Sequence, residues 1–402
     1  MRGILGLVVA GAFCLAVGQA WAQAGAQAGV QAPIKIGVLA DLNGLYGDIG
    51  GAGSVEAARM AVEDFGPTLL GRPLQIVTGD AHNKPDNAVS IVRRWFDEGV
   101  EMVTEIPTSG IALAVMPIAT ERHRIIMITG AGSSDITGKA CSPYVAHWMW
   151  DTYAMARGTG ASVLKAGGDS WYFITVDYAF GKSLEADTTA VVKAGGGTVL
   201  GRAMHPLATA DMSAQLLQAS ASGAKVIGVA NGGGDMINTI KQAREYKVPQ
   251  KLAALVAFVS DIHSLGLETA QGTVLTNAFY WDQDEASRAW SKRFFSRMKY
   301  MPTMVQAGAY STTTHWLKAV QATGTLDADK VMAQMRATPV QDFATKGAML
   351  RADGRLMREM YLYEVKKPAE STGEWDLYKL VNKIAAEDAF RPLADGGCPL
   401  VR

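Results

Sequence analysis

Strand-like and helix-like segments alternate along this sequence, and the alternation occurs twice. In the first half, apolar runs at 34–40, 74–80, 100–105 and 124–129 predict strands. Between them, apolar residues recur at helical spacing; Val55, Ala58 and Val62 are one such set. Because β-α-β connections join parallel strands, this pattern predicts a parallel sheet with helices on both faces.

The same alternation restarts after about residue 150. Strands are predicted at 171–176, 196–204, 225–230 and 252–258, and helices at 182–193, 211–220 and 235–246. A chain of 402 residues is also too long for one typical compact core. The predicted fold class is therefore α/β, with two doubly wound, Rossmann-like lobes joined by a hinge.

The order of the later segments predicts how the chain is shared between the lobes. Residues 273–294 read as a strand, an aromatic corner and a helix, and further helices run to about Ala337. We assign 34–150 and 277–346 to the first lobe, and 151–276 and 347–402 to the second. Several crossings between the lobes would form the hinge.

The N-terminal segment predicts export. Arg2 precedes an apolar stretch from 4 to 17, and Ala20 and Ala22 form an A-x-A cleavage pattern. We expect residues 1–22 to be a signal peptide cleaved after Ala22, and 23–33 to be a flexible lead-in; the alternative is an uncleaved anchor. This interpretation places the mature protein in the periplasm.

Cleavage would leave two cysteines, Cys141 and Cys398. In an oxidising compartment the pair favours one disulfide that ties the C-terminal tail to mid-chain. Two separate buried thiols are the alternative.

Several classes of function lack their signals. The 38 basic and 38 acidic residues balance, which argues against a nucleic-acid partner. Glu56 stands where a dinucleotide-binding G-x-G-x-x-G would need glycine. Neither a G-x-S-x-G elbow nor an H-E-x-x-H helix occurs. These absences argue against nucleotide binding, a zinc site and hydrolase chemistry; an active site assembled from residues far apart in the sequence is the alternative.

Two polar loops follow neighbouring predicted strands in the first half. Ser109 and Gly110 end the segment "PTSG" and open a helix, and Ala131, Gly132 and Ser133 belong to "TGAGSSD". Hydroxyl and N–H groups at such positions can bind a carboxylate. Ser109 could equally cap its helix, and the second loop could form an ordinary turn. Two such loops on adjacent strands favour the anion site.

Aromatic residues follow other strands. Tyr46 lies in the first glycine-rich loop, Tyr178 and Phe180 follow "WYFITV", and Tyr280 lies in "NAFYWDQD". Together they could form the apolar wall of a cleft, although packing within a lobe is the more common fate of each.

The order and spacing of these segments resemble the leucine/isoleucine/valine-binding protein family, the type I periplasmic solute-binding proteins of ABC transporters. The opening "IKIGVLADLNGLYGDIGGAG", the middle "TSGIALAVMPIATERHRIIMITGAGSSDIT" and the aromatic loops carry the resemblance, which covers nearly the whole mature chain. It implies the periplasmic binding protein-like I fold, closure of two lobes on a ligand, and neither catalysis nor cofactor.

The resemblance also implies roles for individual residues. Ser109 and Ser133, with N–H groups near Ala131, look like the carboxylate clamp, and Tyr46 matches the aromatic of the first loop. Phe180 stands where the family often has Tyr, so a phenol hydroxyl would be missing there.

One departure from the family concerns the ligand's ammonium group. Family members that bind α-amino acids usually carry an acidic residue after the strand at 252–258, where this chain has Phe258, with Asp261 three residues on. The other loop on that side offers Asn231. Because a buried ammonium without a counter-charge is costly, we expect a carboxylate with an apolar or aromatic body and weakened α-amino recognition.

The predicted function is therefore that of a monomeric, extracytoplasmic solute-binding component of an ABC importer. It would capture a small carboxylate, either a branched-chain or aromatic amino acid or an aromatic acid, and deliver it to a membrane permease. A ligand sensor with the same fold and a secreted α/β enzyme are the alternatives.

Overall fold

The computed structural model describes residues 32–401, which fall in a single unit of dense contacts. The predicted signal peptide (1–22) and most of the lead-in (23–33) lie outside the described residues. Within this range, no helix combines the length and the apolar character needed to cross a bilayer.

The first lobe is built on a six-stranded sheet with the order β2-β3-β1-β4-β5-β6. All neighbouring pairs are parallel except β2 with β3. Strand β1 is almost wholly buried, as expected for a parallel strand covered on both faces. The strands are β1 (Ile34–Ala40), β2 (Thr68–Leu69), β3 (Arg72–Asp80), β4 (Val100–Glu105), β5 (Ile125–Ile128) and β6 (Val145–His147).

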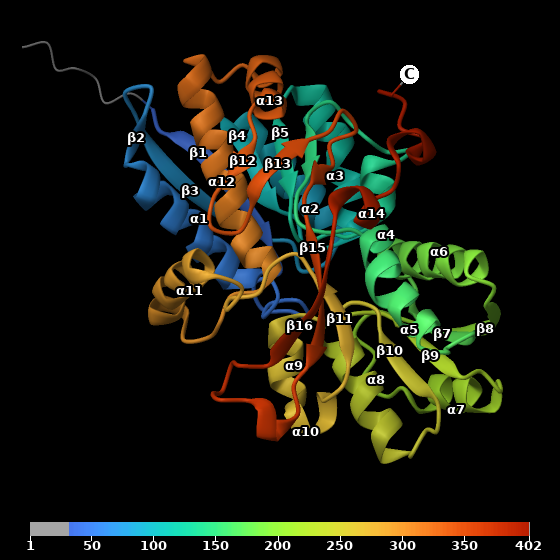
Figure 1. The fold of residues 1–402 in the computed structure, drawn as a ribbon. Coiled ribbons are helices and arrows are strands. Elements are labelled where there is room, and N and C mark those ends of the chain that lie inside the picture. Colours follow the sequence, from blue (N-terminus) through green and yellow to red (C-terminus); the bar gives the residue numbers. More distant parts are fainter. Residues whose placement is uncertain (1–31, 402) are drawn as a thin grey trace, which may run out of the picture. The chain divides into compact units, whose positions relative to one another are not determined.

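Helices from both ends of the chain cover this sheet (Figure 1). Helix α12 packs against α1 and contacts β4, although more than 200 residues separate α12 from α1. Arg293 and Arg297 on α11 form ion pairs with Asp64 and Glu63 on α1. The helices are α1 (Gly51–Phe65), α2 (Pro85–Asp97), α3 (Ser109–Arg122), α11 (Glu285–Met298), α12 (Met304–Thr323) and α13 (Ala328–Ala337).

The second lobe is built on a four-stranded parallel sheet with the order β10-β9-β7-β8. Helices and strands alternate along it as the sequence predicts. Its elements are β7 (Ser170–Val176), α6 (Ala179–Ala194), β8 (Thr198–His205), α7 (Ser213–Ala221), β9 (Val226–Ala230), α8 (Gly234–Glu245), β10 (Lys251–Ala254), α9 (Val259–Leu265) and α10 (Leu267–Ala270).

The chain enters this lobe through a helical run that contains a π-helical turn. The run consists of α4 (Thr152–Met155), the π-turn η2 (Ala156–Gly160) and α5 (Ala161–Lys165). Gly158 lies at the turn, where an added Cβ would fall 2.2 Å from the hydroxyl of Thr276, so the close approach of β11 requires glycine.

Two small antiparallel sheets complete the fold. One has the order β11-β15-β16, and β11 contacts β10 of the second lobe. The other has the order β12-β13-β14, and β13 contacts α13 of the first lobe. Their strands are β11 (Val274–Asn277), β12 (Val340–Gln341), β13 (Lys346–Leu350), β14 (Leu356–Met357), β15 (Met360–Val365) and β16 (Tyr378–Ile384).

The division of the chain between the lobes remains a proposal. Because β13 pairs with β12 and β14 pairs with β13, we place the last crossing between β14 and β15, about ten residues later than the predicted 347. The tail then returns to the first lobe, where Arg391 donates a hydrogen bond to the carbonyl of Ser134. Short helical turns occupy the remainder: η1 (Ser134–Thr137), η3 (Pro368–Glu370), α14 (Ala386–Ala389) and η4 (Leu393–Gly396).

The structure forms the predicted disulfide between Cys141 and Cys398, whose Cα atoms are 5.5 Å apart. The two cysteines are 257 residues apart in the sequence, and the bond fixes the tail beside the loop that precedes β6.

Removing the disulfide should destabilise the protein without abolishing ligand capture. A cross-link over so long a loop restricts the unfolded chain, so C141S/C398S is expected to lower the free energy of unfolding by about 2–4 kcal/mol. Urea unfolding measures the effect, and dithiothreitol treatment of the native protein should reproduce it. Unchanged stability in both experiments would contradict this role.

Candidate functional site

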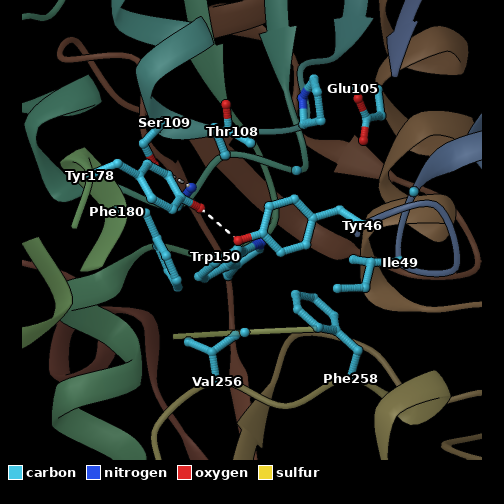
Figure 2. A pocket seen from close by; sticks show the side chains of 16 residues that line it. Tyr46, Ile49, Glu105, Thr108, Ser109, Trp150, Tyr178, Phe180, Val256 and Phe258 are labelled. Atoms are coloured by element: carbon cyan, nitrogen blue, oxygen red, sulfur yellow. Dashed lines mark hydrogen bonds between the residues drawn. The ribbon is translucent and has the colours of Figure 1, made fainter. Parts of the chain in front are cut away.

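A cavity of about 410 Å³, partly open to solvent, lies where the carboxyl ends of the two parallel sheets meet. This volume includes space that is open to solvent. Figure 2 shows side chains from both lobes pointing into it. The lining residues are Tyr46, Ile49, Gly50, Glu105, Pro107, Thr108, Ser109, Gly130, Ala131, Gly132, Trp150, Tyr178, Phe180, Gly232, Val256 and Phe258.

Ser109 lies at the first position of α3 and lines the cavity. The cap of this helix is Thr108, whose hydroxyl accepts a hydrogen bond from the N–H of Ile111. Ser109 Oγ accepts hydrogen bonds from the N–H groups of Gly132 and Ser133, at 3.3 and 3.0 Å. Its own hydrogen therefore remains to be donated, beside the positive end of the helix dipole.

The loop after β5 lines the cavity, but its N–H groups are largely used within the protein. The N–H of Ala131 donates to the carbonyl of Ile106, and those of Gly132 and Ser133 go to Ser109. The hydroxyl of Ser133 accepts from the N–H of Asp135 and caps η1, and Ser133 does not line the cavity. Of the two serines in the predicted clamp, Ser109 is therefore the one that lines the cavity with its hydroxyl hydrogen free to donate.

Tyr46 and Tyr178 meet across the cavity from different lobes. Their hydroxyl groups are 2.9 Å apart, as the dashed line in Figure 2 marks. Burial raises the pKa of both phenols, so both stay protonated at neutral pH. One hydroxyl donates to the other, which closes one side of the cavity.

The rest of the wall is aromatic. The ring of Trp150 makes edge contacts with Phe180 and Phe258, with both pairs of ring centres 5.9 Å apart. The indole N–H of Trp150 donates to the carbonyl of Thr129, which fixes the ring. Gly132 leaves room for this ring, because an added Cβ would fall 2.3 Å from it. The predicted wall residues Tyr46, Tyr178, Phe180 and Phe258 therefore come together around a tryptophan.

Three further predicted site residues do not line the cavity. Gly110 lies one position beyond Ser109 in α3. Asn231 is buried, and its amide bonds to His205 and to Thr239. Tyr280 packs in the core of the second lobe, and its hydroxyl donates to the carbonyl of Trp375 and accepts from the N–H of Leu377.

The sequence did not single out Glu105 and Trp150, nor Ile49, Gly50, Pro107, Thr108, Gly130, Gly232 and Val256. A signal for the first two existed, because Glu105 ends β4 and Trp150 follows β6, and both strands end at the ligand edge of a parallel sheet. Of the other seven, Pro107, Thr108 and Gly130 lie in the two polar loops that the sequence indicated, whereas the rest are small or apolar residues without a feature typical of a site.

The two acids that the sequence placed near the expected ammonium group are already bonded. Asp261 accepts a hydrogen bond from the N–H of Phe258 at 2.9 Å, and Asp235 accepts one from the N–H of Ala208. Burial raises the pKa of Asp261 to about 7 and that of Asp235 to about 6. Neither lines the cavity, and the described residues contain no group of three or more His, Cys, Asp or Glu placed to hold a metal.

Asp261 should make stability fall as the pH rises. Its pKa is about 7 in the folded protein and about 3.9 when unfolded, so the folded state holds a proton that the unfolded state loses between these values. Between about pH 4 and pH 7 we expect this proton to cost the native protein on the order of 1–4 kcal/mol of its free energy of unfolding. D261N keeps an oxygen for the Phe258 N–H but has no carboxyl to titrate, so it should lack this decrease. Urea unfolding across this range measures it. A D261N slope equal to that of the native protein would contradict the assignment.

The chain matches known proteins over most of its length. The family model described as "Periplasmic binding protein" matches residues 33–373. A periplasmic binding protein from Burkholderia mallei is 47% identical, with a TM-score of 0.91, over 92% of this chain and 99% of that one. A comparison with curated proteins finds no match.

Two further solved structures share the fold. A branched chain amino acid ABC transporter periplasmic ligand-binding protein from Burkholderia xenovorans is 38% identical, with a TM-score of 0.82, over 92% of this chain and all (100%) of that one. A solute-binding protein from Rhodopseudomonas palustris in complex with benzoate is 20% identical, with a TM-score of 0.78, over 88% and 96%, and shows the fold alone. The family match confirms the resemblance read from the sequence: the chain belongs to the type I periplasmic binding proteins of ABC transporters.

Proposed function

We propose that this protein captures a small carboxylate with an apolar or aromatic body and delivers it to the permease of an ABC importer. The observation that carries the proposal is the Ser109 hydroxyl, which lies at an aromatic-walled cavity with its hydrogen free. Beside it, the first N–H groups of α3 lack partners within the helix. Hydroxyl and N–H donors at a helix N-terminus suit a carboxylate.

The polarity of the wall supports an apolar ligand body. Among the described residues that line the cavity there is no Lys, Arg or His, so the ligand's negative charge would rest on hydrogen bonds and the helix dipole. The apolar part of the wall includes Trp150, Phe180, Val256 and Phe258. Such a surface favours a flat or branched hydrocarbon body.

The ligands of relatives point to two classes of substrate. The Burkholderia xenovorans protein is the ligand-binding protein of a branched chain amino acid transporter, whereas the more distant Rhodopseudomonas palustris protein was solved with benzoate. Here the two acids expected near an α-ammonium from the sequence, Asp235 and Asp261, hold backbone N–H groups and do not line the cavity. We therefore keep the proposal that α-amino recognition is weakened.

Capture would work by closure of the lobes on the ligand. The bond between Tyr46 and Tyr178, and the bond from the N–H of Ser134 to the hydroxyl of Ser183, join the first lobe to the second. A ligand that touches both walls binds the closed form better than the open form, which shifts the population toward closure. The closed form would then dock on the permease as a monomer, after export and cleavage behind Ala22, without a catalytic step.

Isothermal titration of S109A tests the proposal. With benzoate, 4-hydroxybenzoate, leucine and phenylalanine as probes, the native protein should bind at least one of them. S109A should bind that ligand about 10- to 100-fold more weakly, because it loses a hydrogen bond to a charged group.

S133A is the matched control, because the Ser133 hydroxyl caps η1 and does not line the cavity. It should change the affinity less than about 3-fold. Equal losses in both variants, or full affinity in a folded S109A, would contradict the proposed clamp.

A further inference from the structure

Glu105 is a buried carboxylic acid in the wall of the cavity. It ends β4, lines the cavity and is 2% exposed. Its backbone and that of Ile106 both have left-handed conformations, with φ of 80° and 62°. Non-glycine residues adopt this region at a cost that is typical of functional sites.

The neighbouring strands hold this unusual backbone in place. The N–H of Ile106 donates to the carbonyl of Leu39 on β1, and the N–H groups of Thr129 and Gly130 donate to the carbonyl of Glu105. These bonds fix the backbone at Glu105 and with it the direction of its Cα–Cβ bond.

The carboxyl group itself has no such support. Within the described residues, Glu105 Oε2 is buried and has no hydrogen-bond partner. No basic side chain lines the cavity to pair with it, and burial, with a smaller contribution from Asp41, raises its pKa well above the usual range. A buried polar atom without a partner destabilises the folded state. The fold nevertheless keeps the Glu105 carboxyl, for which the described residues provide no partner.

Gly50 leaves the room that this carboxyl occupies. A Cβ added at Gly50 would fall 2.2 Å from Glu105 Oε1, and the φ of −115° and ψ of −83° at Gly50 lie outside the regions that other residues favour. Glycine at this position therefore suits both the space that the carboxyl occupies and the local backbone conformation.

Glu105 and Ser109 lie on different sides of the cavity. Figure 2 shows Glu105 on the side of Tyr46 and Ile49, and Ser109 on the side of Tyr178 and Phe180. A ligand whose carboxylate is held by Ser109 would thus direct its far end along the aromatic wall toward Glu105.

We infer that Glu105 is a specificity-determining residue that binds a hydroxyl group at the end of the ligand remote from its carboxylate. A protonated carboxyl has one donor and several acceptor sites, and a hydroxyl also donates and accepts, so the two groups satisfy each other. The inference rests on the proposed function and names its substrate class as hydroxylated apolar or aromatic acids.

Titration of matched ligand pairs tests this inference. The probes are 4-hydroxybenzoate with benzoate, and tyrosine with phenylalanine. In any pair that the native protein binds, the hydroxylated member should bind at least about 10-fold more tightly, because the other member leaves the carboxyl unpaired.

Four variants test whether this preference belongs to Glu105. E105M should lose it, whereas E105Q should retain much of it, because an amide also donates and accepts. G50A should resemble E105M, because the added methyl group displaces the carboxyl. S109A should bind both members of a pair more weakly and leave the ratio of their affinities unchanged. E105M should also unfold at a temperature no lower than that of the native protein, since it removes an unpaired buried group.

The outcomes separate this inference from the proposed function. If the native protein binds a pair without preferring its hydroxylated member, or E105M keeps the preference, the inference is overturned and the proposed function stands. If no probe binds, the proposed function fails, and the role of Glu105 fails with it.

Discussion

The parallel direction of the strands is the constraint on which the site depends. In each lobe the carboxyl ends of the strands open at one edge of the sheet, and the cavity lies where these two edges meet. Tyr46 follows β1, Ser109 follows β4, Trp150 follows β6, Tyr178 follows β7 and Phe258 follows β10. Residues far apart in the chain therefore line one cavity, because the strand ends bring them together.

In the wall of that cavity, the first lobe supplies most of the polar groups, and both lobes supply hydrocarbon. Ser109, Glu105 and the start of α3 belong to the first lobe, whereas Phe180, Val256 and Phe258 belong to the second. A ligand with one charged end and an apolar body is therefore fully enclosed only when both lobes reach it. The pairing of Tyr46 with Tyr178 lies along the seam where this enclosure is completed.

The fold was predictable from the sequence because it rests on periodicity. Buried parallel strands such as β1 and β9 are continuous apolar runs, and the helices between them carry apolar residues at regular spacing. The predicted α/β class with two lobes is confirmed. The strand predicted at 252–258 ends early, at Ala254, because Phe258 becomes the cap of α9, where Asp261 binds its N–H.

The site was only partly predictable, because its chemistry depends on contacts that spacing does not encode. Tyr178 and Tyr280 both follow strands and read alike, yet the first lines the cavity and the second bonds to the backbone at Trp375. Ser109 and Ser133 also read alike, yet the Ser133 hydroxyl is used as a cap. Glu105 reads as the last residue of a strand, and only its burial without a partner sets it apart.

The central claim is that a small carboxylate is held between the lobes by Ser109. A crystal structure of the protein with the tightest-binding acid tests it most directly. We expect one carboxylate oxygen about 2.5–2.7 Å from Ser109 Oγ, with the body of the ligand against Trp150 and Phe258. A ligand found outside this cavity, or bound in it with its carboxylate directed away from Ser109, would contradict the claim.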